Sequence, residues 1–370
     1  HVVPVVVCAP TGLAAFNVNG TTIHRVLSLP VEHGKPADYS ALGQDQLTVL
    51  KTTLKGLKLL IIDEVSMVSS LLLLFIHLRM TEVMNSNELF GNVSVCLFAD
   101  LLQLNPVKGN CPYQQVTFLE SKQRLGSIAS IDLWKEFQYT ELTINMRQSG
   151  DKAYANLLSS VRVGGVSDLQ FALLSTRRIV PERRATVTEI SQLFQTLFEG
   201  GESPMILMPT GALCQQVNQA MMQEIGNQIY YLLADDSLDS IVDKPLLAKV
   251  HKAYQKLSDD STRTAGLEKK LELCIGARVM LKRNRDIEAG LVNGSVGTVV
   301  GFNTTLAVNS VKVKFDRIDS PIDIERLTFS FEVLKGVYYI RKQFPLMAAF
   351  AITIHKSQGL SLKCAIIDAG

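Results

Sequence analysis

The chain has 370 residues, more than one typical domain needs and enough for two or three. With 47% hydrophobic and 19% charged residues it can bury a substantial core, and its net charge of +2 excludes a strongly basic tail or surface. Any binding of nucleic acid must therefore come from local placement of charge. The 6 cysteines and 6 histidines are scattered, which excludes a zinc-type cluster and suits free thiols in a reducing compartment.

The first part of the chain alternates apolar strands with helices. The pattern predicts a strand at 2–10, a helix at 11–18, a strand at 57–64, a helix at 69–86, and strands at 92–100 and 139–145. The longest apolar stretch, SSLLLLFIHL, is limited by His77 and Arg79 and is too short to span a membrane, so we expect a buried helix there. Polar residues at the strand ends indicate a doubly wound α/β sheet, in which ligands bind just beyond these ends.

The later part of the chain changes in character. We expect a helix at 151–165, a buried strand at 204–210, a helix at 211–225 and loops over roughly 234–268. Short strands separated by Gly, Asn and Asp turns follow from residue 275 and predict a small β-barrel. Residues 345–368 then return to the α/β pattern.

The strand at 57–64 runs straight into two carboxylates, Asp63 and Glu64. Burying adjacent carboxylates is costly unless something positive compensates, and a metal ion with a phosphate behind it is the simplest compensation. In a nucleotide-hydrolysing sheet, an Asp at this place helps to hold Mg²⁺, and the next Glu orients and polarises the attacking water. The alternative is a helix N-terminus that acidic side chains stabilise.

Two other strand ends carry groups suited to a nucleotide. Gln103 lies three residues after Asp100, in the loop after the strand at 92–100, and its amide can donate to a terminal phosphate. Arg147 follows the strand at 139–145, and a guanidinium is the right group to stabilise charge on a transferring phosphoryl group. Taken alone, the first is an ordinary turn and the second a surface charge.

Two stretches offer groups that contact phosphates. TIHKSQG, residues 353–359, concentrates hydroxyl, imidazole, ammonium and amide groups before Gly359, and these groups could contact phosphates of DNA and of ATP. The alternative for this stretch is a capped loop. APTG, residues 9–12, and TTIH, residues 21–24, offer backbone N–H groups and hydroxyls beyond a strand end, which suits DNA as readily as a nucleotide.

Taken in order, these pieces resemble a known family. The stretches are APTGLAAFNVNGTTIH, LLIIDEVSMV, FADLLQLNPV, LTINMRQ, GARVMLKRNRDIEAGLVNGSVGTV and FPLMAAFAITIHKSQGLSL. They resemble the successive motifs of the PIF-type (petite integration frequency) DNA helicases, in the RecD-like branch of helicase superfamily 1, over residues 3–368. The resemblance implies two RecA-like domains, at 1–140 and 141–370, with ATP between them and a small SH3-like β-barrel inserted at about 296–344.

The resemblance also implies ATP hydrolysis, with Mg²⁺, coupled to 5′–3′ translocation on single-stranded DNA and to unwinding of forked duplex DNA. By position, the resemblance implies that Asp63 binds Mg²⁺, Glu64 activates water, Gln103 senses the γ-phosphate and Arg147 is an arginine finger. It implies that the TIHKSQG stretch couples the ATP state to the DNA, with Thr353, His355 and Lys356 on the DNA side and Gln358 and Gly359 on the nucleotide side. Pro10, Thr11 and His24 are implied to contact DNA. The family further implies DNA repair, recombination and telomere maintenance in the nucleus, with the mitochondrion as a second location.

The sequence departs from the family pattern at both ends. The family's first motif, a Gly-rich phosphate loop ending in Lys-Ser/Thr, is expected upstream of APTG, but the only Gly-Lys pair here is in Gly34-Lys35-Pro36, after the wrong motif. The last motif, with a second finger arginine, is expected beyond Gly370, and His1 begins in mid-strand. We therefore expect a sequence truncated at both ends, which by itself binds and hydrolyses ATP weakly or not at all.

A second function from a different class is a catalytically inactive nucleic-acid-binding remnant of a Helitron-type mobile-element helicase. Retention of Asp63, Glu64, Gln103 and Arg147 together favours the enzyme, because a drifting relic has no physical reason to keep all four. A RecD-like nuclease subunit would need a nuclease-type carboxylate cluster, which we do not find in the sequence. The sequence does not determine the preferred DNA structure or the oligomeric state.

Overall fold

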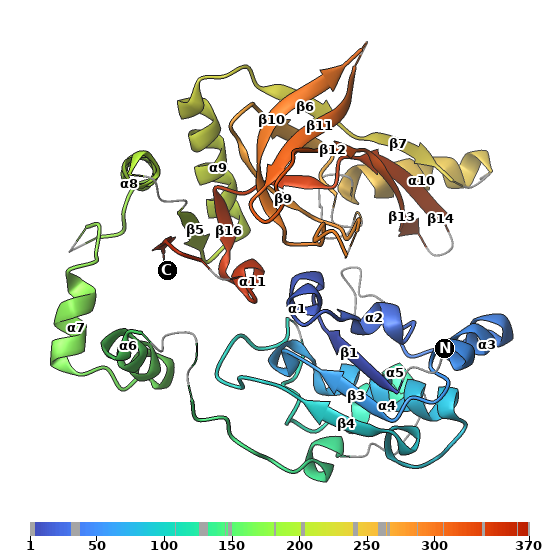
Figure 1. Ribbon diagram of the computed structural model, residues 1–370. Helices are drawn as coiled ribbons and strands as arrows, with labels where there is room; N and C mark the ends of the chain where they lie inside the picture. Colours follow the sequence, from blue (N-terminus) through green and yellow to red (C-terminus); the bar gives the residue numbers. More distant parts are fainter. Residues whose placement is uncertain are drawn as a thin grey trace. The chain divides into compact units, whose positions relative to one another are not determined.

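Figure 1 shows the computed structural model of the chain, which describes residues 4–30, 38–107, 109–125, 132–144, 146, 150–180, 183–200, 204–239, 243–257, 264, 267–286, 288–305, 307–334, 337–360 and 362–368. Contacts divide the chain into two units. Unit 1 is His1–Val6 with Tyr39–Ile190, and unit 2 is Val7–Asp38 with Ser191–Gly370. The domain boundary that the sequence predicts between residues 140 and 141 stays a prediction.

Strands near the start of the chain form a four-stranded sheet with the order β2-β1-β3-β4. They are β1 (Val5–Ala9), β2 (Thr21–Thr22), β3 (Leu59–Ile62) and β4 (Ser94–Leu97). β1 pairs in parallel with β2, and β3 pairs in parallel with β4, beside which it lies in Figure 1. Leu60 and Ile62 of β3 are completely buried. Apolar runs are typical of parallel strands that are largely covered, as β1 and β3 are, whereas β4 has no buried residue and forms by pairing with β3.

The buried helix predicted at 69–86 is α4 (Ser70–Met84). Ser69 caps it, because its Oγ accepts a hydrogen bond from the N–H of Leu72 at 3.1 Å. Arg79 is only 1% exposed, and its Nη1 pairs with Glu82 Oε2 at 2.7 Å, so the buried charge is compensated. Within the described ranges of the chain, no helix is both long and apolar enough to cross a membrane.

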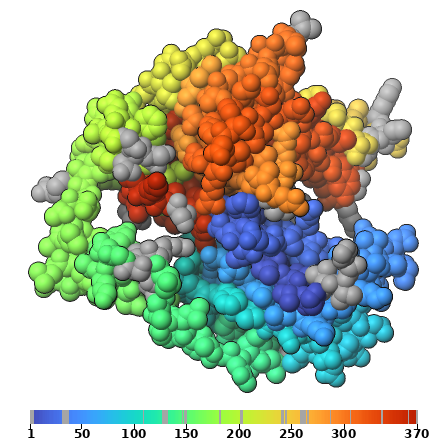
Figure 2. All heavy atoms as spheres, in the orientation of Figure 1, coloured from blue at the N-terminus to red at the C-terminus, as the bar shows by residue number. Residues whose placement is uncertain are grey.

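The other elements of unit 1 are shorter. They are α3 (Gln44–Thr53), the 3₁₀ turns η1 (Val65–Met67), η2 (Leu89–Asn92) and η3 (Leu133–Glu136), and the helices α5 (Phe118–Leu125), α6 (Lys152–Val163) and α7 (Asp168–Ser175), after which comes α8 (Val187–Glu199). Leu169 and Phe171 of α7 are 86% and 62% exposed. Figure 2 shows the light-green segment that contains α7 at the surface. The apolar side chains of α7 are therefore not part of the core of unit 1.

The α/β part of unit 2 is built on three parallel strands with the order β16-β5-β17. Its elements are β5 (Met205–Met208), β16 (Ala351–Thr353), β17 (Ala365–Ile367) and the helices α1 (Gly12–Asn17), α2 (Ile23–Val26), α9 (Gly211–Ile225) and α11 (Ile354–Ser357). Asn218 ties α9 to β16, because its side chain donates to the Ala351 carbonyl at 3.0 Å and accepts from the Ala351 N–H at 2.8 Å. The predicted strand at 204–210 and helix at 211–225 are both present.

Antiparallel strands make up the rest of unit 2, in sheets with the orders β12-β11-β10-β9-β15, β13-β14-β7 and β6-β8. They are β6 (Tyr230–Leu233), β7 (Asp235–Leu238), β8 (Lys270–Leu273), β9 (Arg278–Leu281), β10 (Val296–Thr304), β11 (Val308–Phe315), β12 (Ile322–Glu325), β13 (Leu327–Leu334), β14 (Val337–Gln343) and β15 (Leu346–Ala348). The predicted run of short strands after residue 275 is therefore present. Its closure into an SH3-like barrel at 296–344 stays a prediction.

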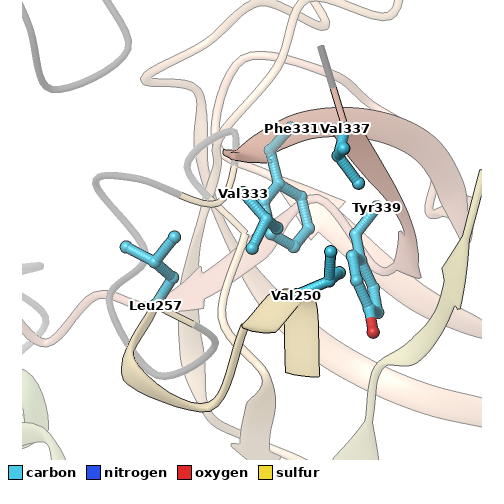
Figure 3. Close-up of a cluster of buried hydrophobic side chains, with 6 residues drawn as sticks. All are labelled: Val250, Leu257, Phe331, Val333, Val337 and Tyr339. Atoms are coloured by element: carbon cyan, nitrogen blue, oxygen red, sulfur yellow. The ribbon is translucent and has the colours of Figure 1, made fainter. Parts of the chain in front are cut away.

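A helix, α10 (Lys244–Leu257), packs on β13 and β14 through an apolar cluster. Figure 3 shows the cluster, which consists of Val250, Leu257, Phe331, Val333, Val337 and Tyr339. The ring of Tyr254 stacks on that of Tyr339 with 4.3 Å between ring centres. Each fully buried side chain of this size contributes about 1.5–3 kcal/mol to stability, so the cluster is sufficient to hold the helix on the sheet.

A buried ion pair lies beside this cluster. Arg341 of β14 is completely buried, and its guanidinium donates to both carboxylate oxygens of Asp236 on β7, at 2.8 and 2.6 Å. The same guanidinium donates to Thr264 Oγ1 at 3.0 Å and to the Leu267 carbonyl at 2.9 Å. Tyr254 of α10 donates to Asp236 Oδ2 at 2.7 Å. The pair thus joins two strands, a helix and a loop around one satisfied charge.

Two sequence predictions are wrong. The strand predicted at 139–145 is not a strand over its described residues 139–144, where Leu142 and Ile144 are 81% and 79% exposed. Strand-forming residues need a neighbouring strand and a covering layer, and these residues have no such cover in unit 1. The loops predicted at 234–268 contain β7 and α10, because the apolar face of α10 is buried against strands that lie about 80 residues further along the chain.

Candidate functional site

The carboxyl end of β3 carries Asp63 and Glu64, both partly buried. The N–H of Phe98 donates to the Ile62 carbonyl at 2.8 Å, and the N–H of Val65 donates to the Phe98 carbonyl at 3.0 Å. These two bonds continue the pairing of β3 with β4 beyond the ends of both strands. Hydrogen bonds to Phe98 therefore fix the backbone on each side of the acid pair, at Ile62 and at Val65.

Glu64 has a left-handed backbone conformation, with φ of 55° and ψ of 43°. For a residue other than glycine this conformation costs about 1–2 kcal/mol. The N–H of Met67 donates to the Glu64 carbonyl at 3.1 Å, and the 3₁₀ turn η1 that this bond closes buries Val65 and Ser66. The Glu64 side chain does not cap that turn, so the helix-terminus alternative does not explain it. Backbone strain that the surroundings maintain is typical of active-site residues.

The loop after β4 is organised by Asp100. Its Oδ1 accepts from the N–H of Leu102 at 3.2 Å, and its carbonyl accepts from the N–H of Gln103 at 3.0 Å. The side chain of Gln103, which is exposed, donates from Nε2 to Asp100 Oδ2 at 3.1 Å. The amide that the sequence singles out is therefore held by a carboxylate that sequence reasoning treated only as a strand end.

The structure brings the acid pair and the amide loop to one edge of the sheet. β3 and β4 run in parallel from Leu59 paired with Ser94 to Ile62 paired with Leu97, so their carboxyl ends lie together. Asp63 and Glu64 follow the end of β3 directly, and Gln103 lies in the loop that follows β4. Arg147 lies outside the described residues, and its role stays a prediction.

A guanidinium that the sequence did not single out reaches this edge. Arg162, in the last turn of α6, pairs through Nη2 with Asp100 Oδ1 at 2.6 Å. The two residues are 62 positions apart, and each lies in an ordinary local context, a helix end and a strand end. A local sequence pattern contains no signal for such a pair.

Pro10, Thr11 and His24, which the sequence predicts on the DNA side, lie in unit 2. Thr11 caps α1, because its Oγ1 accepts from the N–H of Ala14 at 3.2 Å, and Pro10 before it is half-buried. His24 lies in α2, and burial lowers the pKa of its imidazole below 6.5. The imidazole is therefore neutral at neutral pH, and it can give one N–H to a phosphate but contributes no positive charge.

The TIHKSQG stretch begins at the end of β16 and continues through α11. Thr353 and Gln358 are half-buried, whereas His355 and Lys356 are exposed. Gly359 has a φ of 80°, the left-handed conformation that ends this short helix. Polar side chains thus follow a parallel strand end in unit 2 as they do in unit 1.

The structure brings this stretch to α1, the helix that follows APTG. Asn17 of α1 donates from Nδ2 to the Gly359 carbonyl at 2.9 Å, across 342 positions of sequence. Its Oδ1 accepts from Nη1 of Arg317 at 3.2 Å. Two of the stretches that offer phosphate-contacting groups are therefore neighbours in unit 2, as a shared DNA surface requires.

Three basic residues, Lys282, Arg283 and Lys356, form a positive cluster, and Lys356 belongs to the TIHKSQG stretch. Lys282 Nζ lies 3.7 Å from Glu268 Oε1, and burial lowers the pKa of Lys282 to about 8, an effect opposed by Glu268 and reinforced by Lys356 and Arg283. Lys356 is exposed as a residue, yet partial burial of its ammonium also lowers its pKa. Sequence reasoning placed residues 282–284 in a strand segment and in a family motif but did not single out this cluster.

The acid pair fits a magnesium ion better than a metal held by protein alone. The described residues contain no group of three or more His, Cys, Asp and Glu side chains that could hold a metal ion. Mg²⁺ is usually bound through one or two carboxylates together with phosphate oxygens and waters. Asp63, with Glu64 next to it, supplies the oxygen ligands that such a shared site needs. Cys96, Cys111, Cys214 and Cys274 are not joined in disulfides.

Comparisons with known proteins match the whole chain. The family profile described as PIF1-like helicase matches residues 2–170, and that described as DNA helicase Pif1, 2B domain, matches residues 262–302. The human ATP-dependent DNA helicase PIF1 (Homo sapiens) is 28% identical over 373 residues, which is 99% of this chain and 50% of the human protein. The chain belongs to the Pif1-like helicases.

Solved structures of Pif1 helicases agree with this assignment. A structure of the Bacteroides Pif1 helicase in complex with ADP-AlF3 and ssDNA has a TM-score of 0.67 and 25% identity, covering 99% of this chain and 76% of that chain. A second solved Pif1 structure describes DNA unwinding at forked dsDNA by two coordinating Pif1 helicases. It has a TM-score of 0.66 and 27% identity to this chain, and the match covers 98% of this chain and 75% of that chain. The α/β fold with RecA-like domains is thereby confirmed. The chain spans about half the length of the curated relatives it matches.

Proposed function

We propose that this Pif1-like chain works in an ATP-dependent DNA helicase. The observation that carries the proposal is the convergence of Asp63, Glu64 and the Asp100–Gln103 loop at the carboxyl ends of two adjacent parallel strands. Nucleotides bind at this edge in open α/β sheets. Similarity to a Pif1 structure in complex with ADP-AlF3 and ssDNA supports the same site.

In this proposal the acid pair and the Gln103 amide have different roles in ATP hydrolysis. Asp63 holds the nucleotide's Mg²⁺, an ion that neutralises charge on the phosphates when it is bound. Glu64 accepts a hydrogen bond from the attacking water and orients it. Gln103 donates to the γ-phosphate, and Arg147 stabilises the charge that develops during transfer. Gln358 and Gly359 contact the nucleotide from the second stretch.

The DNA side consists of polar groups that suit a phosphate backbone. Pro10, Thr11 and His24 contribute from the first stretch, and Thr353, His355 and Lys356 from the second. The bond between Asn17 and Gly359 supports one continuous surface. The positive cluster of Lys282, Arg283 and Lys356 adds the local charge that a net charge of +2 does not supply by itself.

The proposed partners are single-stranded and forked DNA, because one similar Pif1 structure is a complex with ssDNA and another concerns unwinding at forked dsDNA. The finer proposal is translocation from 5′ to 3′ with unwinding of the duplex ahead. DNA repair, recombination and telomere maintenance are the proposed processes, in the nucleus and as a second location the mitochondrion. These finer points rest on resemblance to the family.

The test measures ATP hydrolysis by the full gene product with and without single-stranded DNA. Wild-type protein is expected to show DNA-stimulated hydrolysis, and Glu64→Gln is expected to lower kcat by about 100-fold or more, since the amide cannot act as a base toward water. Glu88→Gln, at an exposed glutamate elsewhere in unit 1, is the matched control and is expected to leave kcat unchanged.

Two outcomes would overturn the proposal. Hydrolysis that survives Glu64→Gln would remove Glu64 from the mechanism. Tight binding of single-stranded DNA without any hydrolysis by the full gene product would favour the alternative, an inactive nucleic-acid-binding remnant of a Helitron-type helicase. Fluorescence anisotropy with a labelled single strand, measured without nucleotide, tests the binding part of this second outcome.

A further inference from the structure

The ion pair between Arg162 and Asp100 lies within the proposed nucleotide site but belongs to neither the acid pair nor the predicted finger. Asp100 uses both carboxylate oxygens: Oδ1 accepts from Arg162 at 2.6 Å and from the N–H of Leu102 at 3.2 Å, and Oδ2 accepts from Gln103 Nε2 at 3.1 Å. One carboxylate therefore connects the end of α6 to the side chain of Gln103.

The bond from Gln103 to Asp100 fixes which end of the amide is presented. A glutamine amide has a donating NH₂ and an accepting oxygen, and rotation by half a turn exchanges them. An ionised carboxylate only accepts, so Asp100 selects the orientation in which Nε2 faces it. The second N–H of Nε2 then remains for an acceptor such as a phosphate oxygen, whereas the rotated amide would present its oxygen and repel it.

The ion pair between Arg162 and Asp100 contributes little to stability, because both side chains are partly exposed to solvent. The side chain of Arg162 is 49% exposed and that of Asp100 is 28% exposed, so solvent screens the attraction between them. The geometry gives it a different effect. By occupying Oδ1, the guanidinium keeps Oδ2 directed to Gln103 and holds the carboxylate in one rotamer.

Arg162 also connects the loop to a helix that starts close to the predicted finger. α6 begins at Lys152, five residues after Arg147, and Asp151 caps it by accepting from the N–H of Tyr154 at 2.9 Å. The loop after β4 is therefore attached to α6 through the pair of Arg162 with Asp100.

We propose that Arg162 is a positioning residue, which orients the Gln103 amide toward the γ-phosphate through Asp100. The inference rests on the proposed function in one respect, that Gln103 contacts the γ-phosphate. Arg162 itself touches neither nucleotide nor water in this scheme. Its loss should therefore act on the chemical step more than on ATP binding.

The test compares three variants of the full gene product in DNA-stimulated ATP hydrolysis. Arg162→Ala is expected to lower kcat by about tenfold while KM for ATP changes by less than about twofold, the pattern of a contact made mainly in the transition state. Arg162→Lys, which keeps a charge that reaches one oxygen, is expected to restore most of the rate. Arg177→Ala, at an exposed arginine of unit 1, is the matched control.

A double-mutant cycle separates positioning from general weakening of the fold. In an Asp100→Asn background, Arg162→Ala is expected to have no further effect on kcat, because both changes break the same connection. Equal losses of kcat in the two backgrounds would overturn the proposal. So would wild-type kcat in Arg162→Ala, or a rise in KM with a drop in melting temperature that Arg162→Lys does not rescue.

Hydrogen exchange tests the inference independently of catalysis. If the wild-type protein hydrolyses no ATP, the proposed function fails, yet the connection from Arg162 to the loop is still measurable. Arg162→Ala is expected to raise the exchange rate of the Leu102 and Gln103 amides, which Asp100 now holds, by about tenfold, since local opening sets that rate. Unchanged exchange of these amides would overturn the positioning role.

Discussion

Lys282 makes the stability of unit 2 depend on pH in a direction unusual for a paired lysine. Its side chain is 13% exposed, and burial is the main cause that lowers its pKa from 10.5 to about 8. Below pH 8 the ammonium is charged in the folded and in the unfolded chain, so the cost of burying the charge is fully present. Between pH 8 and 10.5 the unfolded chain binds a proton that the folded chain does not, so stability rises with pH.

The size of the effect follows from the shift. A fall in pKa from 10.5 to about 8 corresponds to a cost of about 3 kcal/mol at low pH, because each pKa unit is worth about 1.4 kcal/mol. Raising the pH from about 7 to about 9.5 relieves about 2 kcal/mol of this cost. Glu268 limits the cost by attraction, whereas Lys356 and Arg283 add to it by repulsion.

The assay is urea unfolding followed by circular dichroism, for wild type and Lys282→Met. Methionine keeps most of the volume and removes the charge, so the variant is expected to be the more stable one near pH 7 and to lose about 2 kcal/mol of that advantage near pH 9.5. Titrating groups that do not contact Lys282 cancel in the difference between the two proteins. Lys342→Met, at an exposed lysine of β14, is the control and should show no such change.

One result would refute this reasoning. If the difference in free energy of unfolding between wild type and Lys282→Met is the same at both pH values, the ammonium is not buried as described. The explanation from desolvation would then be wrong, and the variant's effect would be one of packing alone.

Three further predictions test other parts of the chain. Arg341→Met is expected to lower the free energy of unfolding by about 3–5 kcal/mol because it leaves the Asp236 carboxylate buried without its cation, and adding Asp236→Leu should recover part of the loss in urea unfolding. Gly297→Ala is expected to lower the melting temperature, since its Cβ would lie 2.7 Å from the Lys314 carbonyl oxygen, whereas Gly301→Ala on the same strand has room and should change it little; equal effects would contradict this. Glu64→Gly is expected to raise the free energy of unfolding by about 1 kcal/mol while abolishing ATP hydrolysis, because it relieves the left-handed strain and removes the base; a less stable variant would show that the strain is absent.

Local patterns predicted most elements because the driving force for each is local. The run at 59–62 forms β3 and the run at 205–208 forms β5, since a short continuous apolar segment is stable only as a strand covered on both faces. Ser69 marks the start of α4 because its side-chain oxygen satisfies one of the first free N–H groups of the helix. The acid pair and Gln103 were predictable from local sequence too, as polar residues directly after a strand and in the loop after the next one.

The same logic failed where cover was the deciding factor. The segment at 139–144 has strand-forming residues but leaves Leu142 and Ile144 in solvent. The segment at 244–257 has apolar residues at helical spacing, Val250, Tyr254 and Leu257, which the prediction of loops overlooked, and it forms α10 with this face buried by β13 and β14. Local propensity shows which secondary structures a segment can adopt, and the layer that packs against the segment determines which of them forms.

The sequence alone determined the family, the α/β class and the residues at the strand ends, because composition, periodicity and motif order are properties of contiguous residues. Only the tertiary structure decided which distant groups meet: Arg162 with Asp100, Asn17 with Gly359, and Lys282 with Glu268. The packing of buried surfaces determines which of these side chains meet. Pairing between residues that are far apart in the sequence produces no periodic pattern along the chain.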